Sequence, residues 1–302
     1  MIDAAARSAL KEARSAVEFD ALLSRHISLR VGGPAAAIAS PRNRDELSEI
    51  LRICDAHNVP YRALGAGFNT LVLDGGFDGI AIGTRGLRGL ALDGDSLSAE
   101  AGTSHSQVTR FCISRGRSGL EFAAGIPGTV GGWIAMNAGI AGREVEAVVQ
   151  SIEWIGPGGV PGGCDRSDLD FAYRSLRLPV AGSIVTAARF KTRPAERVDV
   201  QEEVDRMLAQ RSKTQPLDVP SCGSVFKNPE GHFAGQLMEA ADLKGTRVGG
   251  AEISDLHANF IVNRGGATAS DVLHLIEQAQ EAVQRVHGIA LETEVKIMGR
   301  PS

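Results

Sequence analysis

The sequence of 302 residues has few aromatic residues, few cysteines and no excess of charge of one sign. Its 32 lysines and arginines nearly balance 36 aspartates and glutamates, so the formal net charge is −4. This balance excludes a protein that is held to nucleic acid by an overall positive field. The four cysteines lie far apart and form no CxxC pair, which excludes a zinc ribbon and a disulfide framework and favours reduced thiols in a cytosolic protein.

Long apolar segments are absent as well. The longest stretch without a charged residue, residues 122–142, is interrupted by glycines and a proline and therefore predicts no transmembrane helix. The amino-terminal residues are charged and rich in alanine, without the apolar core of a signal peptide, and predict an amphipathic helix. We therefore expect a cytoplasmic monomer whose partner is a small molecule rather than a membrane or a nucleic acid.

Several familiar motifs are missing. The sequence contains no GxGxxG fingerprint for dinucleotides, no GxxxxGK[ST] phosphate loop, and no HExxH or GxSxG motif. Its seven histidines are scattered without the spacing of metal ligands, so we predict no metal site. Glycine, in contrast, is abundant: the 36 glycines exceed the usual share of ~7% and favour backbone that lies close to a bulky ligand such as a phosphate group.

The hydrophobic periodicity predicts helices and strands in irregular alternation, which is typical of an α+β or mixed α/β fold. A helix capped by Asn43 carries one apolar stripe. Ser270 is the predicted cap of the clearest helix, with Val286 on its apolar face and Gly288 at its end. The other predicted helices cover residues 106–115 and 200–211, and predicted strands cover residues 61–64, 80–82, 97–101, 152–155, 184–190, 260–262 and 295–298.

The first of two glycine-rich loops is Gly65-Ala66-Gly67-Phe68-Asn69-Thr70, which lies between two strand-like runs. Small residues leave backbone N–H groups exposed, and such a nest binds the oxygens of a pyrophosphate. Asn69 and Thr70 add side-chain donors. Taken alone, the loop is better explained as a plain tight turn.

The second loop, GIPGTVGG from Gly125 to Gly132, leads into a predicted short helix that begins near residue 131. The first N–H groups of such a helix lack internal partners and favour an anion, and Thr129 adds a hydroxyl. Small residues let a flat ring system lie against the backbone, and here they are Gly132, Ala135, Ala138 and Gly139. A close-packed contact between helix and loop is the alternative, but two such loops favour a large phosphate-bearing cofactor.

Polar groups that could take part in chemistry follow in three places. Arg174 offers a planar guanidinium that binds two oxygens of a carboxylate or of a developing enolate. Ser224 is a poor acid by itself but relays a proton where its neighbours support it. Glu292 and Glu294 share one face of a strand pattern. Taken one at a time, these residues are better explained as an exposed arginine, a capped turn and an edge strand.

A series of motifs follows between about residues 26 and 300: LRVGGPA, LGAGFNTLV, GLEFAAGIPGTVGGWIAMNAG, FAYR, CGSVFKNP, HANFIVNRGGATASDV and LETEV. In this order they resemble the UDP-N-acetylenolpyruvoylglucosamine reductases, which are FAD-dependent enzymes of bacterial peptidoglycan synthesis. The combination of GIPGTVGG and MNAG with GSVFKNP is highly specific for that family.

The resemblance implies a reaction and its catalytic residues. NADPH reduces FAD, and the enzyme then reduces the enolpyruvyl sugar nucleotide to UDP-N-acetylmuramate. Hydride passes from flavin N5 to C3 of the enolpyruvyl group, and a serine protonates C2. By match to the motifs, the serine is Ser224, an arginine that stabilises the developing charge is Arg174, and a glutamate that orients or polarises the site is Glu294.

The resemblance also implies which residues bind the two ligands. Tyr173, Lys227 and Asn228 are the expected contacts to the substrate, and Asn228 is matched to the uridine-diphosphate part. The expected contacts to non-covalent FAD are Leu64, Gly65, Ala66, Gly67, Phe68, Asn69, Thr70, Gly125, Ile126, Pro127, Gly128, Thr129, Gly132, Ala135, Asn137, Ala138 and Gly139.

The fold that the resemblance implies is an FAD-binding fold of two subdomains, of the vanillyl-alcohol-oxidase type, plus a carboxyl-terminal α/β substrate-binding domain. We expect the first subdomain over residues 1–88, with residues 289–302 returning to it. The second subdomain covers residues 89–198, and the substrate domain covers residues 199–288. A polar segment with Pro194 marks the boundary before the last domain.

The sequence also departs from the family pattern. Phe68 and Thr70 replace the serine and leucine that are usual in the first loop, and Ile140 follows MNAG where alanine is common. In the segment that matches the family motif YRxSxF, Leu176 stands where the later serine would be. The chain between Lys191 and Ser224 is too short for the tyrosine-bearing substrate loop of one subgroup, so the sequence resembles the shorter, second type.

Three alternatives remain open from the residues themselves. Another flavoprotein oxidase of the same superfamily would act on a small alcohol or sugar and carry covalent flavin, for which His105 is the nearest candidate. A protein that binds a nucleotide sugar without catalysis would use the glycine loops only structurally. A nucleophilic Cys222 is the weakest alternative, because no histidine and carboxylate pair lies near it in sequence.

Overall fold

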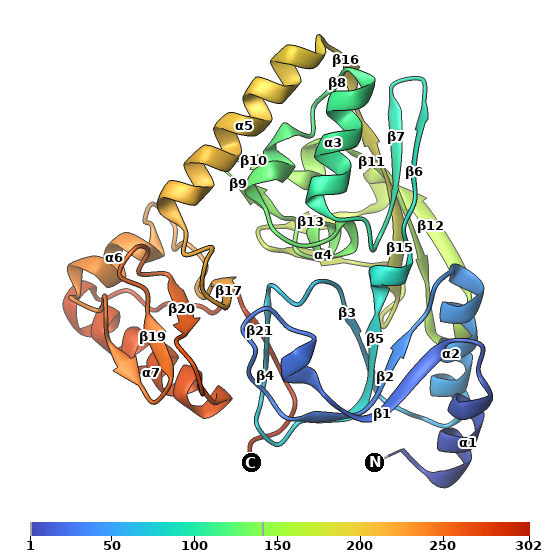
Figure 1. Cartoon of the computed structure of the whole chain (residues 1–302), viewed down its shortest axis with the longest axis horizontal. Helices are drawn as coiled ribbons and strands as arrows, with labels where there is room; N and C mark the ends of the chain where they lie inside the picture. The colour runs from blue at the N-terminus through green and yellow to red at the C-terminus, as the bar shows by residue number, and fades with distance from the viewer. Residues whose placement is uncertain (1, 141) are drawn as a thin grey trace. The chain divides into compact units, whose positions relative to one another are not determined.

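The computed structural model describes residues 2–140 and 142–302, whose contacts divide the chain into two units (Figure 1). The first unit comprises the residues up to Phe19 together with Ala36–Ala66 and Gly79–Gln210. The second unit comprises Asp20–Ala35, Gly67–Asp78 and Arg211–Ser302. Both glycine loops therefore have residues in the first unit, and the first loop continues into the second unit after Ala66.

A four-stranded sheet with the order β1-β2-β5-β3 carries the helices α1 and α2. Asn43 caps α2 as predicted, because its side chain accepts a hydrogen bond from the Glu46 N–H. The apolar stripe of α2, which includes Leu47 and Ile50, is fully buried against the sheet. The bounds are α1 Ala4–Glu12, β1 Ala16–Leu22, β2 Pro34–Ser40, α2 Arg44–Ala56, β3 Tyr61–Leu64 and β5 Phe77–Gly83.

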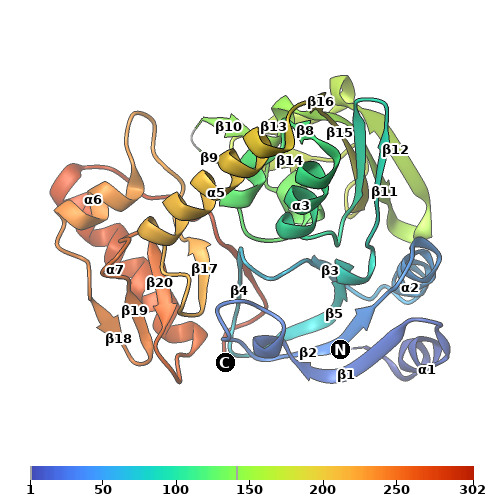
Figure 2. The same cartoon turned by 45° about the horizontal axis from the view of Figure 1, so that its top comes forward.

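A five-stranded antiparallel sheet forms the core of the rest of the first unit, with the order β12-β11-β15-β7-β6. Ser104 and Gln107 form a capping box at the start of α3, and Gly116 ends this helix at a φ of 59°. Helix α5 is three residues longer at each end than predicted (Figure 2). The bounds are β6 Leu90–Asp93, β7 Ser96–Glu100, α3 His105–Arg115, α4 Val130–Ala135, β11 Val149–Ile155, β12 Pro161–Asp165, β15 Ile184–Lys191 and α5 Arg197–Thr214.

The second unit contains a four-stranded antiparallel sheet with the order β17-β20-β19-β18, and α7 packs against it. Two predictions for α7 are wrong. Its cap is Thr268 rather than Ser270, whose N–H and hydroxyl donate instead to Asp74, and Val286 is 52% exposed. Gly288 ends the helix as predicted. The bounds are β17 Ser221–Ser224, α6 Ala234–Ala240, β18 Arg247–Val248, β19 Ala251–Ile253, β20 Phe260–Asn263 and α7 Ala269–His287.

Short paired segments complete the fold. In the second unit, β21 runs parallel to β4, with Lys296 opposite Thr70. The chain therefore returns, near residue 296, to a segment more than 200 residues earlier. The bounds are β4 Thr70–Val72, β8 Arg117–Ser118, β9 Gly139–Ile140, β10 Arg143–Glu144, β13 Asp170–Ala172, β14 Ser175–Arg177, β16 Arg193–Pro194 and β21 Lys296–Met298. Short 3₁₀ turns cover Leu23–Arg25, Thr84–Gly86, Glu121–Gly125, Val145–Ala147, Pro157–Gly159 and Arg166–Asp168.

The mixture of helices and strands agrees with the predicted α+β class, and each predicted strand is present with bounds that differ by a few residues. The division into three domains stays a prediction. Within the described part of the chain, every helix is too short or too polar to cross a membrane. The described histidines, cysteines and carboxylates include no cluster of three that suits a metal ion.

Candidate functional site

The two glycine loops meet at Gly65 and Thr129, both in the first unit. Strand β3 ends at the buried Leu64, and a Cβ added at Gly65 would lie only 2.8 Å from the Thr129 hydroxyl oxygen. Thr129 is 4% exposed, and its hydroxyl has no hydrogen-bond partner among the described residues. Buried hydroxyls are nearly always paired, so this one fits a ligand oxygen that would lie beside the glycine backbone.

The backbone around Thr129 borders free space. A Cβ added at Gly128 or Gly132 would meet no atom of the described residues within 4 Å, and Gly128 has a φ of 109°, which favours glycine. The loop is fixed from behind, because Gly128 accepts a hydrogen bond from the His105 N–H. Three features together fit a phosphate-bearing cofactor such as FAD. They are the buried Thr129 hydroxyl without a described partner, the lack of room for a side chain at Gly65, and the open space at Gly128 and Gly132.

One part of the predicted anion site is wrong. Helix α4 begins at Val130, close to the predicted start, but its first N–H groups already have partners within the protein. The Val130 N–H donates to the Thr103 carbonyl, and the Gly131 N–H donates to the Ala101 carbonyl. These two groups therefore do not bind an anion, and the Thr129 hydroxyl is the better candidate.

The small residues after α4 divide into two groups. Gly132 and Ala135 are exposed, which agrees with an open surface. Gly125 and Gly139 are instead required by close packing: a Cβ at Gly125 would lie 2.9 Å from the Ile140 side chain, and a Cβ at Gly139 would lie 2.4 Å from the Arg143 carbonyl oxygen. The prediction that Gly139 is small to accommodate a flat ring thus has a different physical explanation.

Asn137 is fully buried, and its side chain holds neighbouring parts of the first unit together. Its Oδ1 accepts from the Glu146 N–H at 3.2 Å, while its Nδ2 donates to Glu144 at 2.9 Å and to the Ala172 carbonyl at 3.2 Å. These hydrogen bonds provide partners within the protein for both polar atoms of the Asn137 side chain, so no ligand is needed to pair them. A direct contact of the Asn137 side chain with the cofactor, which the motif match predicts, therefore finds no support in these contacts.

Arg174 lies in the tight turn between β13 and β14, close to Gly139. Its guanidinium donates to the Gly139 carbonyl at 3.3 Å and lies 5.0 Å from the centre of the Tyr173 ring. Arg174 has a φ of 57°, a left-handed conformation that costs an ordinary residue about 1 kcal/mol. Residues in such conformations cluster at functional sites, and the Ala172 carbonyl at the base of this turn is the one that Asn137 binds.

The segments that contain Ser224 and Glu294 pair with each other in the second unit. The Glu294 N–H donates to the Val225 carbonyl at 2.7 Å, and Phe226 pairs with Thr293 in an antiparallel bridge. These contacts place the segment that contains Glu294 alongside the end of β17, where Ser224 lies. Both side chains are partly exposed, as groups that meet a substrate must be.

A β-bulge determines how Ser224 leaves its strand. Ser221 is opposite Val262 and Ser224 is opposite Phe260, so β17 has one extra residue over this interval. Gly223 has a φ of 79° within the bulge. Bulges redirect side chains and are frequent next to active sites.

The second half of the first glycine loop lies next to the same segment. The Asn69 side chain donates to the Glu294 carbonyl at 3.2 Å, and the Lys296 N–H donates to the Asn69 carbonyl. Gly67 is buried, and its carbonyl accepts from both the N–H and the hydroxyl of Ser28. A predicted cofactor loop and a predicted catalytic glutamate are thus neighbours within one unit.

The two residues expected to bind the substrate in GSVFKNP have protein partners. Lys227 forms an ion pair with Glu292, and its N–H donates to the Glu292 carbonyl. Asn228 accepts a hydrogen bond from the Ala234 N–H at the start of α6. Neither contact excludes a substrate, because a lysine ammonium has three N–H donors and an asparagine amide has two.

Cys222 does not have the properties of a nucleophile. Burial, with a smaller contribution from the nearby Glu294 carboxylate, raises the pKa of its thiol to about 12. A thiol with such a pKa is almost entirely protonated at neutral pH, whereas the thiolate is the reactive form. The alternative of Cys222 chemistry is therefore wrong.

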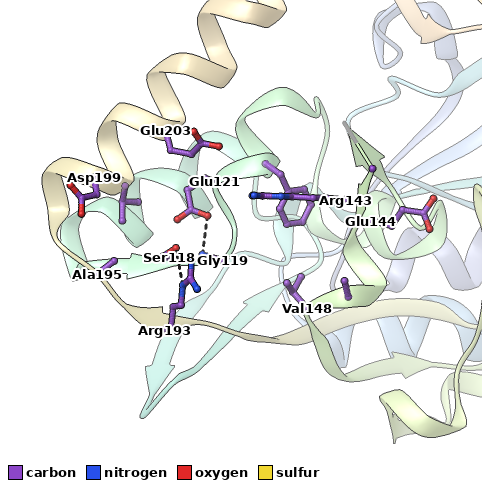
Figure 3. Close-up of a pocket in the computed structure, with 14 residues that line it drawn as sticks. Ser118, Gly119, Glu121, Arg143, Glu144, Val148, Arg193, Ala195, Asp199 and Glu203 are labelled. Carbon is purple, nitrogen blue, oxygen red and sulfur yellow. Dashed lines mark hydrogen bonds between the residues drawn. The ribbon is translucent and has the colours of Figure 1, made fainter. Parts of the chain in front are cut away.

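A cavity of about 610 Å³ lies elsewhere in the first unit (Figure 3). Figure 3 shows acidic and basic side chains of mixed sign around it, among them Glu121, Arg143, Glu144, Arg193 and Glu203. Glu121 accepts from the Gly119 N–H, and a hydrogen bond from Arg206 lowers the pKa of Glu203. The residues that line this cavity include none of the predicted site residues.

Some residues that hold the site together were not predicted. Ser28 lies 2.9 Å from the Gly67 carbonyl and 2.6 Å from the Ser221 carbonyl, and it thereby joins the first glycine loop to β17. Asn259 binds the backbone next to Ser224. Both are polar residues within or beside apolar runs of the sequence, and that is the signal that could have revealed them.

Comparison with known protein families agrees with this geometry. The family model described as UDP-N-acetylenolpyruvoylglucosamine reductase, C-terminal domain, matches residues 215–298. The model described as FAD binding domain matches residues 35–160. Together they cover both glycine loops and the segments that contain Ser224 and Glu294.

Similar proteins are found over nearly the whole chain. The UDP-N-acetylenolpyruvoylglucosamine reductase of Streptococcus suis is 41% identical over 286 residues, which are 95% of each chain. The reductase of Moorella thermoacetica is 43% identical over 277 residues, which are 92% of this chain and 91% of the relative.

Solved structures show the same fold. The crystal structure of UDP-N-acetylenolpyruvylglucosamine reductase from Thermus caldophilus is 35% identical, with a TM-score of 0.81, and covers 95% of this chain and 99% of that chain. Berberine bridge enzyme from Eschscholzia californica, at 18% identity and a TM-score of 0.50, covers 64% of this chain and 44% of its own. The second likeness concerns the fold alone.

The fold and the two glycine loops define an FAD-dependent oxidoreductase with an FAD-binding fold of the vanillyl-alcohol-oxidase type. Within that class, the chain belongs to the UDP-N-acetylenolpyruvoylglucosamine reductase family. Family membership supports the FAD-mediated reduction of this nucleotide sugar in peptidoglycan synthesis, with NADPH as the usual co-substrate of the family. A binding protein without catalysis is therefore excluded.

Proposed function

We propose that the chain uses NADPH and FAD to reduce UDP-N-acetylglucosamine enolpyruvate to UDP-N-acetylmuramate, with Ser224 as the proton donor. The observation that carries the proposal is the pairing of the segment after Ser224 with the segment around Glu294 in the second unit. The two segments pair through their backbones although 70 residues of sequence separate Ser224 from Glu294. The cytoplasmic location and the monomeric state stay predictions.

The residues present fit FAD, which when bound supplies the hydride for C3 of the enolpyruvyl group. Thr129 would donate its buried, unpaired hydroxyl to a phosphate oxygen, beside Gly65 and the open backbone of Gly128. Gly132 and Ala135 contribute exposed surface that a flat ring could cover. The remaining predicted contacts of the two loops are part of the same proposal.

Ser224 would give its hydroxyl proton to C2 of the substrate. A serine hydroxyl is a weak acid, so the transfer requires a strongly basic carbon and a fixed donor position. The bulge at Gly223 directs the residue out of the regular strand, and the hydrogen bonds of Val225 and Phe226 fix the backbone that follows. Glu294, held by its N–H on the Val225 carbonyl, would orient the donor or polarise the site.

Arg174 would stabilise the negative charge that develops on the substrate carboxylate as C2 gains carbanion character. A guanidinium binds both oxygens of a carboxylate in one plane. The Arg174 residue is partly exposed, and an arginine guanidinium carries five N–H donors. Tyr173, which is 43% exposed next to it, together with Lys227 and Asn228 would contact other parts of the substrate.

The proposal is tested by the colour of the purified protein. We expect a yellow protein that NADPH bleaches and that recolours under anaerobic conditions only when the enolpyruvyl sugar nucleotide is added. NADH and UDP-N-acetylglucosamine, which lacks the enolpyruvyl group, serve as controls. Reduced protein that stays bleached with the enolpyruvyl compound would contradict the proposal, and hydrogen peroxide released with small alcohols would favour an oxidase.

A further inference from the structure

The Asn259 side chain forms two hydrogen bonds to the backbone of one residue, Phe226. Its Oδ1 accepts from the Phe226 N–H at 2.9 Å, and its Nδ2 donates to the Phe226 carbonyl at 2.8 Å. Asn259 is 4% exposed, and Phe226 is 1% exposed. Both the oxygen and the nitrogen of the Asn259 side-chain amide therefore have a hydrogen-bond partner, and both bonds are buried. Buried hydrogen bonds are strong, and their loss would leave the N–H and carbonyl of Phe226 without partners.

Further backbone bonds hold the same segment. The Asn259 carbonyl accepts from the Val225 N–H at 2.9 Å, so Asn259 binds two consecutive residues after Ser224. On the other side, the Val225 carbonyl accepts from the Glu294 N–H at 2.7 Å, and the Lys227 N–H donates to the Glu292 carbonyl. The Val225–Phe226 backbone is thus held between Asn259 and the segment that contains Glu294.

The side chain of Asn259 continues the hydrogen bonding of β17 beyond the point where the pairing of β17 with β20 ends. Strand β17 pairs with β20 up to Ser224 opposite Phe260, and Asn259 is the residue just before β20. An asparagine side chain presents one donor and one acceptor, as a backbone residue of a neighbouring strand does. Its two bonds fix the peptide planes on both sides of Phe226, and they limit the rotation of the backbone that carries Ser224.

Asn259 is itself held by its own turn. The Asn259 N–H donates to Nδ1 of His257 at 3.2 Å, and the His257 ring packs on Phe260 with 4.9 Å between ring centres. Burial lowers the pKa of His257, so the ring is neutral and Nδ1 is able to accept this bond. The amide is therefore presented from a rigid support and not from a mobile loop.

We propose that Asn259 is a positioning residue for proton transfer, which acts on the substrate through Ser224. The inference rests on the proposed role of Ser224 and adds a residue that determines where its hydroxyl lies relative to Glu294. A displacement of about 1 Å at a reacting group can slow a reaction by ~100-fold. Loss of the two hydrogen bonds from the Asn259 side chain to Phe226 should therefore slow protonation at C2. The reduction of FAD by NADPH does not use Ser224 and should be spared.

The test compares Asn259→Ala with a matched control, Asn263→Ala, in the full-length FAD-bound enzyme. Asn263, at the other end of β20, is 9% exposed, donates to the Leu29 carbonyl at 3.1 Å and accepts from the Gly265 N–H at 2.9 Å. Both variants therefore lose a buried amide with bonds to backbone. Rapid-mixing absorbance gives the rates of flavin reduction by NADPH and of reoxidation by the enolpyruvyl sugar nucleotide, each in H₂O and in D₂O.

We expect Asn259→Ala to reoxidise ~10- to ~100-fold more slowly than the wild type, with a larger solvent isotope effect on that step and flavin reduction within about twofold. Asn263→Ala should keep the wild-type isotope effect. If Asn259→Ala does not fold, Asn259→Asp keeps the size and the acceptor for the Phe226 N–H, and the same increase in isotope effect is expected.

Two results would overturn different claims. In the first, the Asn259 variants reoxidise with the same rates and isotope effects as Asn263→Ala, while Ser224→Ala is strongly slowed. This result would refute the positioning role of Asn259 and leave the proposed function intact. Reoxidation that Ser224→Ala leaves intact would refute the proposed function itself.

Discussion

The two parts of the predicted catalytic set are held in different ways. Arg174 belongs to the first unit, in a two-residue turn with a left-handed backbone, and its guanidinium makes a long bond of 3.3 Å to a carbonyl. Ser224 and Glu294 belong to the second unit, where bonds of 2.7–2.9 Å hold the backbone beside them. Arg174 is thus a flexible side chain on a turn with a left-handed backbone. Ser224 and Glu294, in contrast, lie on segments whose backbones are held by short hydrogen bonds.

The difference follows from what each group is proposed to do. A guanidinium that stabilises charge acts through several donors over a range of positions, so a flexible side chain suffices. A hydroxyl that delivers a proton must lie within hydrogen-bond distance of one carbon and in line with it. We therefore expect rigid support where the proton is delivered and tolerance where the charge is stabilised.

The largest effect is expected from Ser224→Ala. Removal of the hydroxyl should slow reoxidation by the enolpyruvyl sugar nucleotide by ~10²- to ~10⁴-fold, the range typical of a general acid, and leave flavin reduction by NADPH nearly unchanged. Rapid-mixing absorbance of the two half-reactions measures both rates. Equal slowing of the two half-reactions would contradict the role of proton donor.

A somewhat smaller effect is expected from Arg174→Lys, which keeps the charge and loses the planar fork. Reoxidation should slow by ~10²- to ~10³-fold while the flavin content is unchanged. Arg177→Lys is the matched control, because Arg177 lies in the same hairpin with its side chain 85% exposed and pairs only loosely with Asp170. If both variants react alike, the guanidinium of Arg174 has no special role.

Thr129→Val tests the proposed contact of the Thr129 hydroxyl, in the first unit, with FAD. Loss of the hydroxyl should weaken FAD binding by ~5- to ~10-fold, which corresponds to about 1 kcal/mol for one hydrogen bond. The apoprotein should not lose stability, because this hydroxyl has no partner among the described residues. Titration of the apoprotein with FAD and thermal melts without FAD measure the two effects.

Thr109→Val is the control for this variant. Thr109 is 5% exposed, and its hydroxyl donates to the His105 carbonyl at 3.0 Å. This substitution should lower the melting temperature of the apoprotein and leave FAD affinity unchanged. The opposite pattern in the two threonine variants would remove the argument that Thr129 faces the cofactor.

The smallest effect concerns the stability of the turn at Arg174. Arg174→Gly should be more stable than Arg174→Ala by about 1 kcal/mol, because glycine adopts a φ of 57° without the clash of a Cβ. Both variants lose the guanidinium equally, so the comparison isolates the backbone. Chemical denaturation measures the free energy of unfolding, and equal values would show that the turn carries no strain.

Local patterns predicted the fold well. Asn43 caps α2, Gly288 ends α7, and the predicted strands are present with bounds that differ by a few residues. These features depend on residues that are close in sequence, so propensity and periodicity suffice. Where two local caps compete, the sequence is ambiguous: Thr268 caps α7, because Ser270 is occupied by Asp74.

The site was predictable only in part. The motifs indicated Ser224, Glu294 and Arg174, but not the roles of the residues around them. The Val130 and Gly131 N–H groups meet carbonyls of a distant loop, and Asn137 binds Ala172, which lies 35 residues later. Such partners depend on tertiary packing, which neither spacing nor residue type reveals.

The parallel pairing of β21 with β4, which joins segments far apart in sequence, has a consequence for how the second unit folds. Contacts such as Asn69 with Glu294 and Ser28 with Ser221 join segments 225 and 193 residues apart, and closing such large loops delays folding. A fragment that begins near residue 211 would contain Ser224 and Glu294 but neither Ser28 nor Asn69. Such a fragment should be a poor substitute for the intact chain in studies of ligand binding, because the strand that neighbours β21 would be missing.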